Sequence, residues 1–221
     1  IGADGLIIIK PSEIADFEMV MYNADGSRAE MCGNAIRCVA RYVYDRHYVH
    51  STEFSIESMG KVKYISLILK ENEVKLVRVD MGAPVLKAAE VPVLSSKEKV
   101  INEKITVNGT AFNMTCVSMG NPHAVMFLNK SPKDFELETF GPLFENHKLF
   151  PRRVNAEFAM VSDRNNIEMR VWERGTGETL ACGTGTCATV VAAILNGYAD
   201  KDVTVHLLGG KLNISWSGNE Q

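Results

Sequence analysis

The composition lacks the features that nucleic-acid-binding and membrane proteins require. The 221 residues carry 24 Lys and Arg against 27 Asp and Glu. This net charge of −3 gives no excess of positive charge that would bind nucleic acid. No apolar run approaches the roughly 20 residues of a membrane helix, and the run at 6–9 has the length of a strand. We therefore expect neither nucleic acid nor a membrane among the partners.

Cysteine is sparse, and the pattern supports neither a disulfide scaffold nor a metal site. The five cysteines are an odd number in a chain of this size, and no Cys-x-x-Cys pair indicates a dedicated redox role. A reducing, cytoplasmic setting is therefore expected. Cys38, Cys116 and Cys187 lie in apolar runs, which predicts that they are buried. The histidines show no metal-ligand spacing, so we assign no metal.

Two Cys-Gly dipeptides, each at the start of a helix-like run, are the most informative feature present. Cys32 and Cys182 are 150 residues apart (182 − 32 = 150). The same offset relates the runs 17–23 and 167–173, which share Glu and Met in place, and the Gly-Lys pairs at 60–61 and 210–211. A single register held over about 45 residues suggests an internal repeat. The pattern predicts two duplicated halves with one cysteine each.

The arrangement of short strand-like runs around two helical runs predicts an α+β fold. Apolar residues at helical spacing mark helices at 33–43 and 186–196, and a short helix with a Gly-Pro break is expected at 134–144. We expect two pseudo-symmetric halves, each a mostly antiparallel sheet or barrel wrapped around a central helix. The N-terminal half would be 1–80 and the C-terminal half 81–221. Because some motifs would have counterparts before residue 1 or after residue 221, we expect the natural protein to extend beyond both ends.

The positions of the two cysteines predict acid–base chemistry. A free thiol titrates near about 8.5, and a helix N-terminus is expected to lower that pKa because its N–H groups stabilise a thiolate. The same N–H groups would hold a substrate carboxylate and oppose the charge that develops when an α-proton leaves. One thiol on each face of the α-carbon would then invert the stereocentre. This chemistry requires no cofactor.

Several spaced motifs resemble those of the diaminopimelate epimerase family along essentially the whole chain. They lie at 23–27, 31–34, 120–125, 151–155, 173–179 and 181–185. The resemblance implies a fold of two α/β halves with the active site in the cleft between them. It also implies a pyridoxal-phosphate-independent isomerase that interconverts LL- and meso-diaminopimelate without a cofactor, on the path to lysine and peptidoglycan precursors. The expected partner is therefore this small molecule, and a homodimer is left open.

The resemblance also assigns roles to individual residues. Cys32 and Cys182 would be the catalytic acid–base pair, one for each stereoisomer. Gly183 and Thr184 would donate to the reacting carboxylate. The remaining expected site residues are Gly33 and Asn34 on the opposite side, Asn23, Asn121, Asn155, Glu173 and Arg174 as substrate-recognition groups, and His123 as a supporting residue.

Two other functions remain open at this point. A proline or hydroxyproline racemase of the same fold resembles the second cysteine motif, but that family usually has His where this chain has Asn34. A thiol redox protein or a non-catalytic binding protein would use the same two cysteines. Assays with both amino acids, and substitution of each cysteine, would separate these alternatives.

Overall fold

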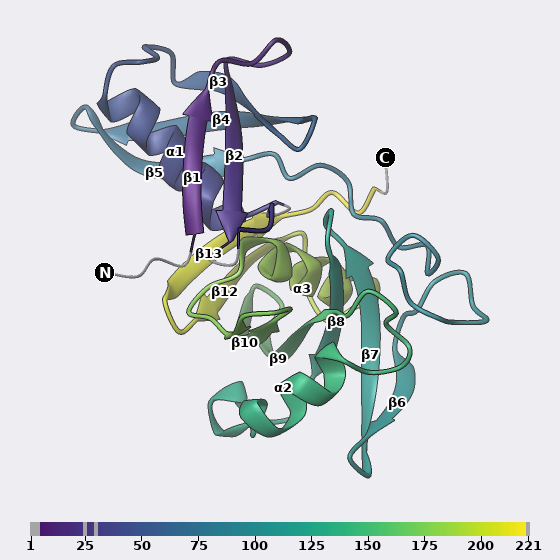
Figure 1. Cartoon of the computed structure of the whole chain (residues 1–221). Helices are drawn as coiled ribbons and strands as arrows, with labels where there is room; N and C mark the ends of the chain where they lie inside the picture. Colours follow the sequence, from purple (N-terminus) through teal and green to yellow (C-terminus); the bar gives the residue numbers. More distant parts are fainter. Residues whose placement is uncertain (1–4, 24–25, 29–30, 220–221) are drawn as a thin grey trace. The chain divides into compact units, whose positions relative to one another are not determined.

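The computed structural model describes residues 5–23, 26–28 and 31–219 (Figure 1). The chain divides into two compact units, Ile1–Gly82 and Ala83–Gln221. None of the described helices is long and apolar enough to cross a membrane.

The first unit is a mixed sheet with one helix packed on it. The described strands follow the order β1-β2-β3-β4-β5, in which only the β2–β3 pair is parallel. Apolar residues of β2 to β5 and of the helix share one core. The elements are β1 (Gly5–Lys10), β2 (Phe17–Asn23), α1 (Gly33–Asp45), β3 (Glu53–Ser58), β4 (Lys61–Lys70) and β5 (Glu73–Val79).

Helix α1 is amphipathic, and its apolar stripe decides which side chains are buried. Ile36, Val39, Ala40 and Val43 recur at helical spacing and are all buried. Cys38 lies off this stripe and is exposed, so the prediction that it is buried was wrong. An apolar neighbourhood in sequence does not place a residue on the inner face of a helix. Burial is confirmed for the other two non-motif cysteines.

The second unit is a larger mixed sheet with α2 and α3 on opposite faces. Its described strands follow the order β13-β12-β10-β9-β8-β7-β6, with β11 added to β10. The β8–β9 and β10–β12 pairs are parallel. The elements are β6 (Glu103–Val107), β7 (Thr110–Ser118), β8 (Pro122–Phe127), the 3₁₀ turn η1 (Pro132–Asp134), α2 (Leu137–Glu145), β9 (Asn155–Asp163), β10 (Asn166–Glu173), β11 (Gly177–Glu178), α3 (Gly183–Leu195), β12 (Asp202–Leu207) and β13 (Gly210–Ser215).

The alternation of side chains along the strands separates two cores in this unit. Even-numbered residues of β8 and β9, such as Met126 and Phe158, pack in the cluster that contains Phe144 of α2. Odd-numbered Ala159 of β9 packs in the other cluster, with Val190 of α3. Polar residues at odd positions of β8 and β9 are therefore directed toward α3.

Helix α2 continues through the Gly-Pro pair that was expected to break it. Pro142 lies inside the helix, so the predicted break was wrong. A proline here removes one hydrogen bond to the first turn, and the packed side of the helix compensates for that loss. Gly141 is required by packing, because an added Cβ would lie 2.4 Å from the Trp172 ring.

The α+β class and the repeated halves are confirmed. The order strand, helix, strand, strand occurs as β2-α1-β3-β4 and again as β10-α3-β12-β13, where the two-residue strand β11 is added between β10 and α3. Both helices have 13 residues and start 150 residues apart, at Gly33 and Gly183. Helix α3 is buried on nearly every side, as expected for the centre of a half, and begins three residues before the predicted start.

Candidate active site

Both cysteines of the Cys-Gly pairs are N-caps of helices with nearly the same backbone conformation. Cys32 has φ −122° and ψ 107°, and Cys182 has φ −124° and ψ 111°. In each unit the sulfur accepts a hydrogen bond from the backbone N–H three residues later, at 3.4 Å from Ala35 and 3.3 Å from Gly185. This is the geometry of a polar N-cap with sulfur in place of oxygen. The two thiols therefore occupy equivalent positions in the two units.

In the first unit an arginine fixes the polar side chain beside Cys32. Arg37 Nη2 donates to Asn34 Oδ1 at 2.7 Å, and Arg37 Nη1 donates to the carbonyl oxygen of Gly33 at 2.9 Å. These two hydrogen bonds fix the orientation of the Asn34 amide relative to the start of α1. Asn23 ends β2, but its side chain lies outside the part of the chain that the structure describes.

In the second unit a line of polar side chains runs from Cys182 into the protein interior. Cys182 Sγ lies 3.6 Å from Thr184 Oγ1, which accepts from Asn121 Nδ2 at 3.3 Å. Asn121 Oδ1 is 2.9 Å from His123 Nε2, and His123 Nδ1 is 2.7 Å from Glu157 Oε1. The structure thus brings three of the predicted residues, Thr184, Asn121 and His123, into one hydrogen-bonded chain with Cys182.

Asn155 supports the turn that carries Glu173 and Arg174. Its Oδ1 accepts from the backbone N–H of Arg174 at 2.9 Å, and its Nδ2 donates to the carbonyl oxygen of Pro122 at 2.8 Å. Arg174 Nη1 donates to the carbonyl oxygen of Arg152, and Glu173 accepts from the Thr179 hydroxyl. Asn155 is buried and serves the backbone, whereas Glu173 and Arg174 are half-buried.

Comparison with known proteins decides the family. The sequence profile described as diaminopimelate epimerase matches residues 1–87 and 115–221. The chain is 53% identical to a diaminopimelate epimerase of Methanococcus maripaludis, over 98% of this chain and 78% of that protein. It is 56% identical to one of Agathobacter rectalis, with the same shares covered.

The chain belongs to the diaminopimelate epimerase family. Epimerases are isomerases, so the predicted enzyme class is confirmed. Among solved structures, a hydroxyproline epimerase from Agrobacterium vitis matches with a TM-score of 0.73 at 12% identity, over 97% of this chain and 67% of that one. At that identity the likeness concerns the fold alone, and it supports the predicted fold class.

The structure corrects the expected acidity of one thiol of this family member. The helix N-terminus was expected to lower the pKa of Cys182. Instead, burial raises that pKa well above its usual value, and the charges of Glu173 and Glu157 raise it further. The hydrogen bonds from Thr184 and Gly185 act in the opposite direction but are smaller effects. Cys182 therefore rests as a thiol at neutral pH.

Alkylation tests this correction. At pH 8 we expect iodoacetamide to label Cys182 at least ten-fold more slowly than exposed Cys38, because only the thiolate is the nucleophile. The Cys182 rate should increase about ten-fold per pH unit while the pH stays below its pKa. Peptide mass spectrometry measures both rates, and the protein unfolded in guanidinium is the control in which they converge. A Cys182 rate that levels off below pH 8 would contradict a raised pKa.

Three supporting residues were missed in the sequence. Arg37 donates a hydrogen bond to Asn34, and Glu157 is hydrogen-bonded to His123. Glu145 accepts hydrogen bonds from three groups near the Glu173–Arg174 turn. Glu157 had a visible signal, since it is the only polar residue in the otherwise apolar run 156–161. Glu145 had none, because its partners come from other segments.

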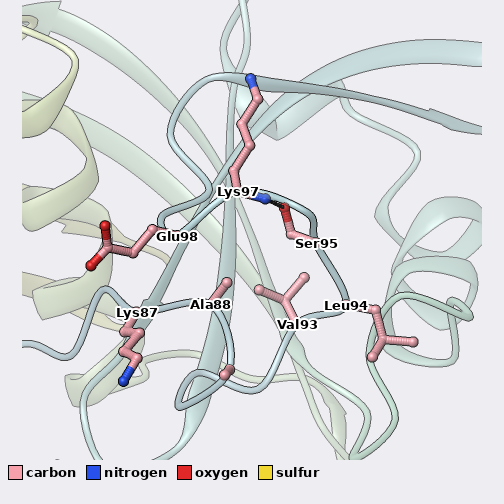
Figure 2. Close-up of a pocket in the computed structure, with 8 residues that line it drawn as sticks. Lys87, Ala88, Val93, Leu94, Ser95, Lys97 and Glu98 are labelled. Carbon is pink, nitrogen blue, oxygen red and sulfur yellow. Dashed lines mark hydrogen bonds between the residues drawn. The ribbon is translucent and has the colours of Figure 1, made fainter.

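A surface hollow of the second unit contains none of these residues. It encloses about 440 Å³ and lies in the segment between β5 and β6 (Figure 2). Figure 2 shows the Lys97 N–H donating to Ser95 Oγ, a local turn contact of 3.0 Å. Among the described residues, no group of three or more His, Cys, Asp or Glu side chains could hold a metal ion. The lining residues are Lys87, Ala88, Ala89, Val93, Leu94, Ser95, Lys97 and Glu98.

Proposed function

We propose that this protein interconverts LL- and meso-2,6-diaminopimelate by a two-base thiol mechanism that needs no cofactor. Membership of the diaminopimelate epimerase family, at 53–56% identity over nearly the whole chain, is the observation that carries this function. The equivalent N-cap geometry of Cys32 and Cys182 supports the assignment of the two bases. The product would enter lysine and peptidoglycan precursor synthesis.

The resting proton on Cys182 gives the two thiols different roles in one direction of the reaction. Cys32 acts as the base and takes the α-proton from one face of the carbon, and the electron pair of the C–H bond moves into the carboxylate. The S–H of Cys182 then returns a proton to the opposite face. The products are the inverted amino acid, a Cys32 thiol and a Cys182 thiolate. The reverse direction exchanges the two roles.

Backbone amides at the helix starts oppose the charge that this step creates. The first N–H groups of a helix have no intrahelical partner, and Gly183 and Thr184 provide two of them next to Cys182. Aimed at the reacting carboxylate, they stabilise the developing enediolate more than the ground state. In the first unit Gly33 and Asn34 have the corresponding positions.

The turn after β10 suits the distal, non-reacting amino-acid group. Arg174 matches a carboxylate through bidentate hydrogen bonds, and Glu173 matches an ammonium group. Asn121 and Asn23 complete the polar set, and Asn155 acts by holding the Arg174 backbone. Recognition of a second amino-acid head group favours diaminopimelate over a proline ring, which has no such group.

An assay with two substrates in heavy water tests this function. We expect conversion of LL-diaminopimelate to the meso isomer, with no racemisation of L-proline and deuterium at one α-carbon only. Proton NMR and chiral chromatography measure the label and the isomers. Racemisation of proline alone, or label at both α-carbons of each turnover, would contradict the assignment.

We also place the enzyme in the cytoplasm. All five cysteines are free thiols in the structure, and free catalytic thiols persist in a reducing compartment. Fractionation followed by immunoblotting would test this location.

A further inference from the structure

Glu157 lies beneath the first turn of α3 and belongs to none of the roles assigned so far. It pairs with Val125 of β8 and Val171 of β10 in the sheet register, and its odd position directs it toward α3. Its side chain has no exposed surface. An added Cβ on Gly185 would lie 2.6 Å from Glu157 Oε1 and 3.2 Å from Cys182 Sγ. Glycine at 185 therefore makes room for both the carboxyl group and the sulfur.

The burial of this carboxyl group costs stability. Within the described part of the chain, Glu157 Oε2 is fully buried and has no hydrogen-bond partner. Burial raises the pKa of Glu157, and the adjacent His123 only partly offsets that shift. A buried polar atom without a partner typically costs about 1–3 kcal/mol. Residues that lower the stability of the fold in this way are typically found at functional sites.

The hydrogen bonds fix which nitrogen of His123 carries a proton. Asn121 turns its carbonyl oxygen to His123 Nε2 and its NH₂ group to Thr184. Because a carbonyl oxygen only accepts, Nε2 must donate. Glu157 faces the other nitrogen, Nδ1, at 2.7 Å. In a neutral imidazole Nδ1 is then the acceptor, so the Glu157 carboxyl group carries its proton and donates to Nδ1. Glu157 thereby selects the Nε2–H form of His123 that donates to Asn121.

We propose that Glu157 is a positioning residue, which holds His123 as an Nε2–H donor and thereby orients Asn121 and Thr184 toward the sulfur of Cys182. With Asn121 donating to Thr184, the Thr184 hydroxyl hydrogen is left for Cys182 Sγ. This orientation favours the thiolate that forms when Cys182 gives up its proton. The role rests on the proposed function of Cys182 as an acid and base.

The surroundings of Glu157 contain few other ionisable groups. Besides His123, those that interact with it are Cys116 on β7, Cys182 at the start of α3 and Glu173 on β10. All three are acids whose negative forms would oppose an ionised Glu157. His123 is thus the one basic group among these neighbours, which makes it the group that Glu157 controls.

Two substitutions separate positioning from packing. Glu157→Met has a similar volume but cannot bond to Nδ1, so we expect kcat to fall about 10- to 100-fold, the loss typical when the hydrogen-bond partner of a metal-bound histidine is removed. KM should stay within about three-fold, because no substrate contact is lost. Glu157→Gln can donate to Nδ1 and should keep kcat within about three-fold of wild type. The unfolding temperature of the Met variant should fall only modestly, because the loss of the partner of His123 Nδ1 is partly offset by removal of the unpaired Glu157 Oε2.

NMR of the imidazole nitrogens provides a readout that is independent of activity. The wild-type and Gln proteins should show a protonated Nε2 on His123, and the Met variant should lose this preference. Thr189→Val is the matched control, because Thr189 is a buried hydroxyl of α3 that bonds to Met169 and not to this chain of residues. It should leave kcat unchanged.

Each result either supports or overturns the role of Glu157. Full activity in Glu157→Met, or equal losses in the Met and Gln variants, would overturn it. An unchanged Nε2 signal in the Met variant would overturn it as well. If wild type itself does not epimerise diaminopimelate, the proposed function fails, and the NMR comparison still decides whether Glu157 sets the state of His123.

Discussion

Replacing either Cys32 or Cys182 by alanine is expected to lower the kcat for diaminopimelate epimerisation by about 10³-fold, since a positioned acid or base contributes roughly 10²–10⁴-fold. Each thiol serves one face of the α-carbon, so the loss of either one blocks the complete inversion in both directions. Substrate affinity, measured by calorimetry, should change by less than about three-fold. The effect is therefore on the chemical step and not on binding.

Two other cysteines serve as matched controls for this experiment. Cys187→Ala removes a buried thiol from the same helix that Cys182 caps, and Cys38→Ser changes an exposed thiol on α1. Both should keep near wild-type kcat. A Cys182→Ala variant with wild-type kcat would show that inversion does not pass through this thiol. A loss that is equally large in Cys187→Ala would indicate damage to helix α3 instead.

Replacing Glu145 by alanine is expected to destabilise the second unit and to weaken substrate binding. Glu145 is buried and accepts from Trp172 Nε1 at 2.8 Å, from the Gly175 N–H at 2.9 Å and from Arg153 Nη1 at 2.9 Å. The substitution leaves the Trp172 and Gly175 donors unpaired, at a cost of about 3 kcal/mol. The unfolding temperature should then fall by roughly 6–12 °C.

The same substitution should raise KM more than it lowers kcat. Gly175 follows Glu173 and Arg174, the residues proposed to recognise the distal group, so a displaced turn misplaces both. We expect KM to rise about ten-fold when activity is measured well below the unfolding temperature. Thr139→Ala, on the exposed side of α2, should change stability by no more than about 0.5 kcal/mol. A lower unfolding temperature with unchanged KM would show that the turn does not depend on Glu145.

Much of the candidate site is local in sequence and was therefore predictable. A cysteine followed by glycine before an apolar helix is an N-cap pattern, and both N-caps form as expected. The repeat at 150 residues predicted that the two would have the same geometry. The strands and hairpins also follow from alternation and turn residues, since these patterns depend on neighbours in the chain.

The errors arose where distant segments set the outcome. The acidity of Cys182 depends on burial and on Glu157 and Glu173, which belong to two other strands. Cys38 is exposed because it does not lie on the apolar stripe of α1. Pro142 is tolerated inside α2 because that helix is held against β9 and β10 by its packed face.

The sequence by itself determined the family, the α+β class and the two equivalent thiols, because repeated motifs and helix starts are encoded by adjacent residues. The tertiary structure alone decided that Cys182 rests protonated and that Asn121, His123 and Glu157 form a single hydrogen-bonded chain with it. Both features depend on which side chains three neighbouring elements direct into one buried space. Electrostatic and hydrogen-bond energies depend on distances in space, which sequence spacing does not specify.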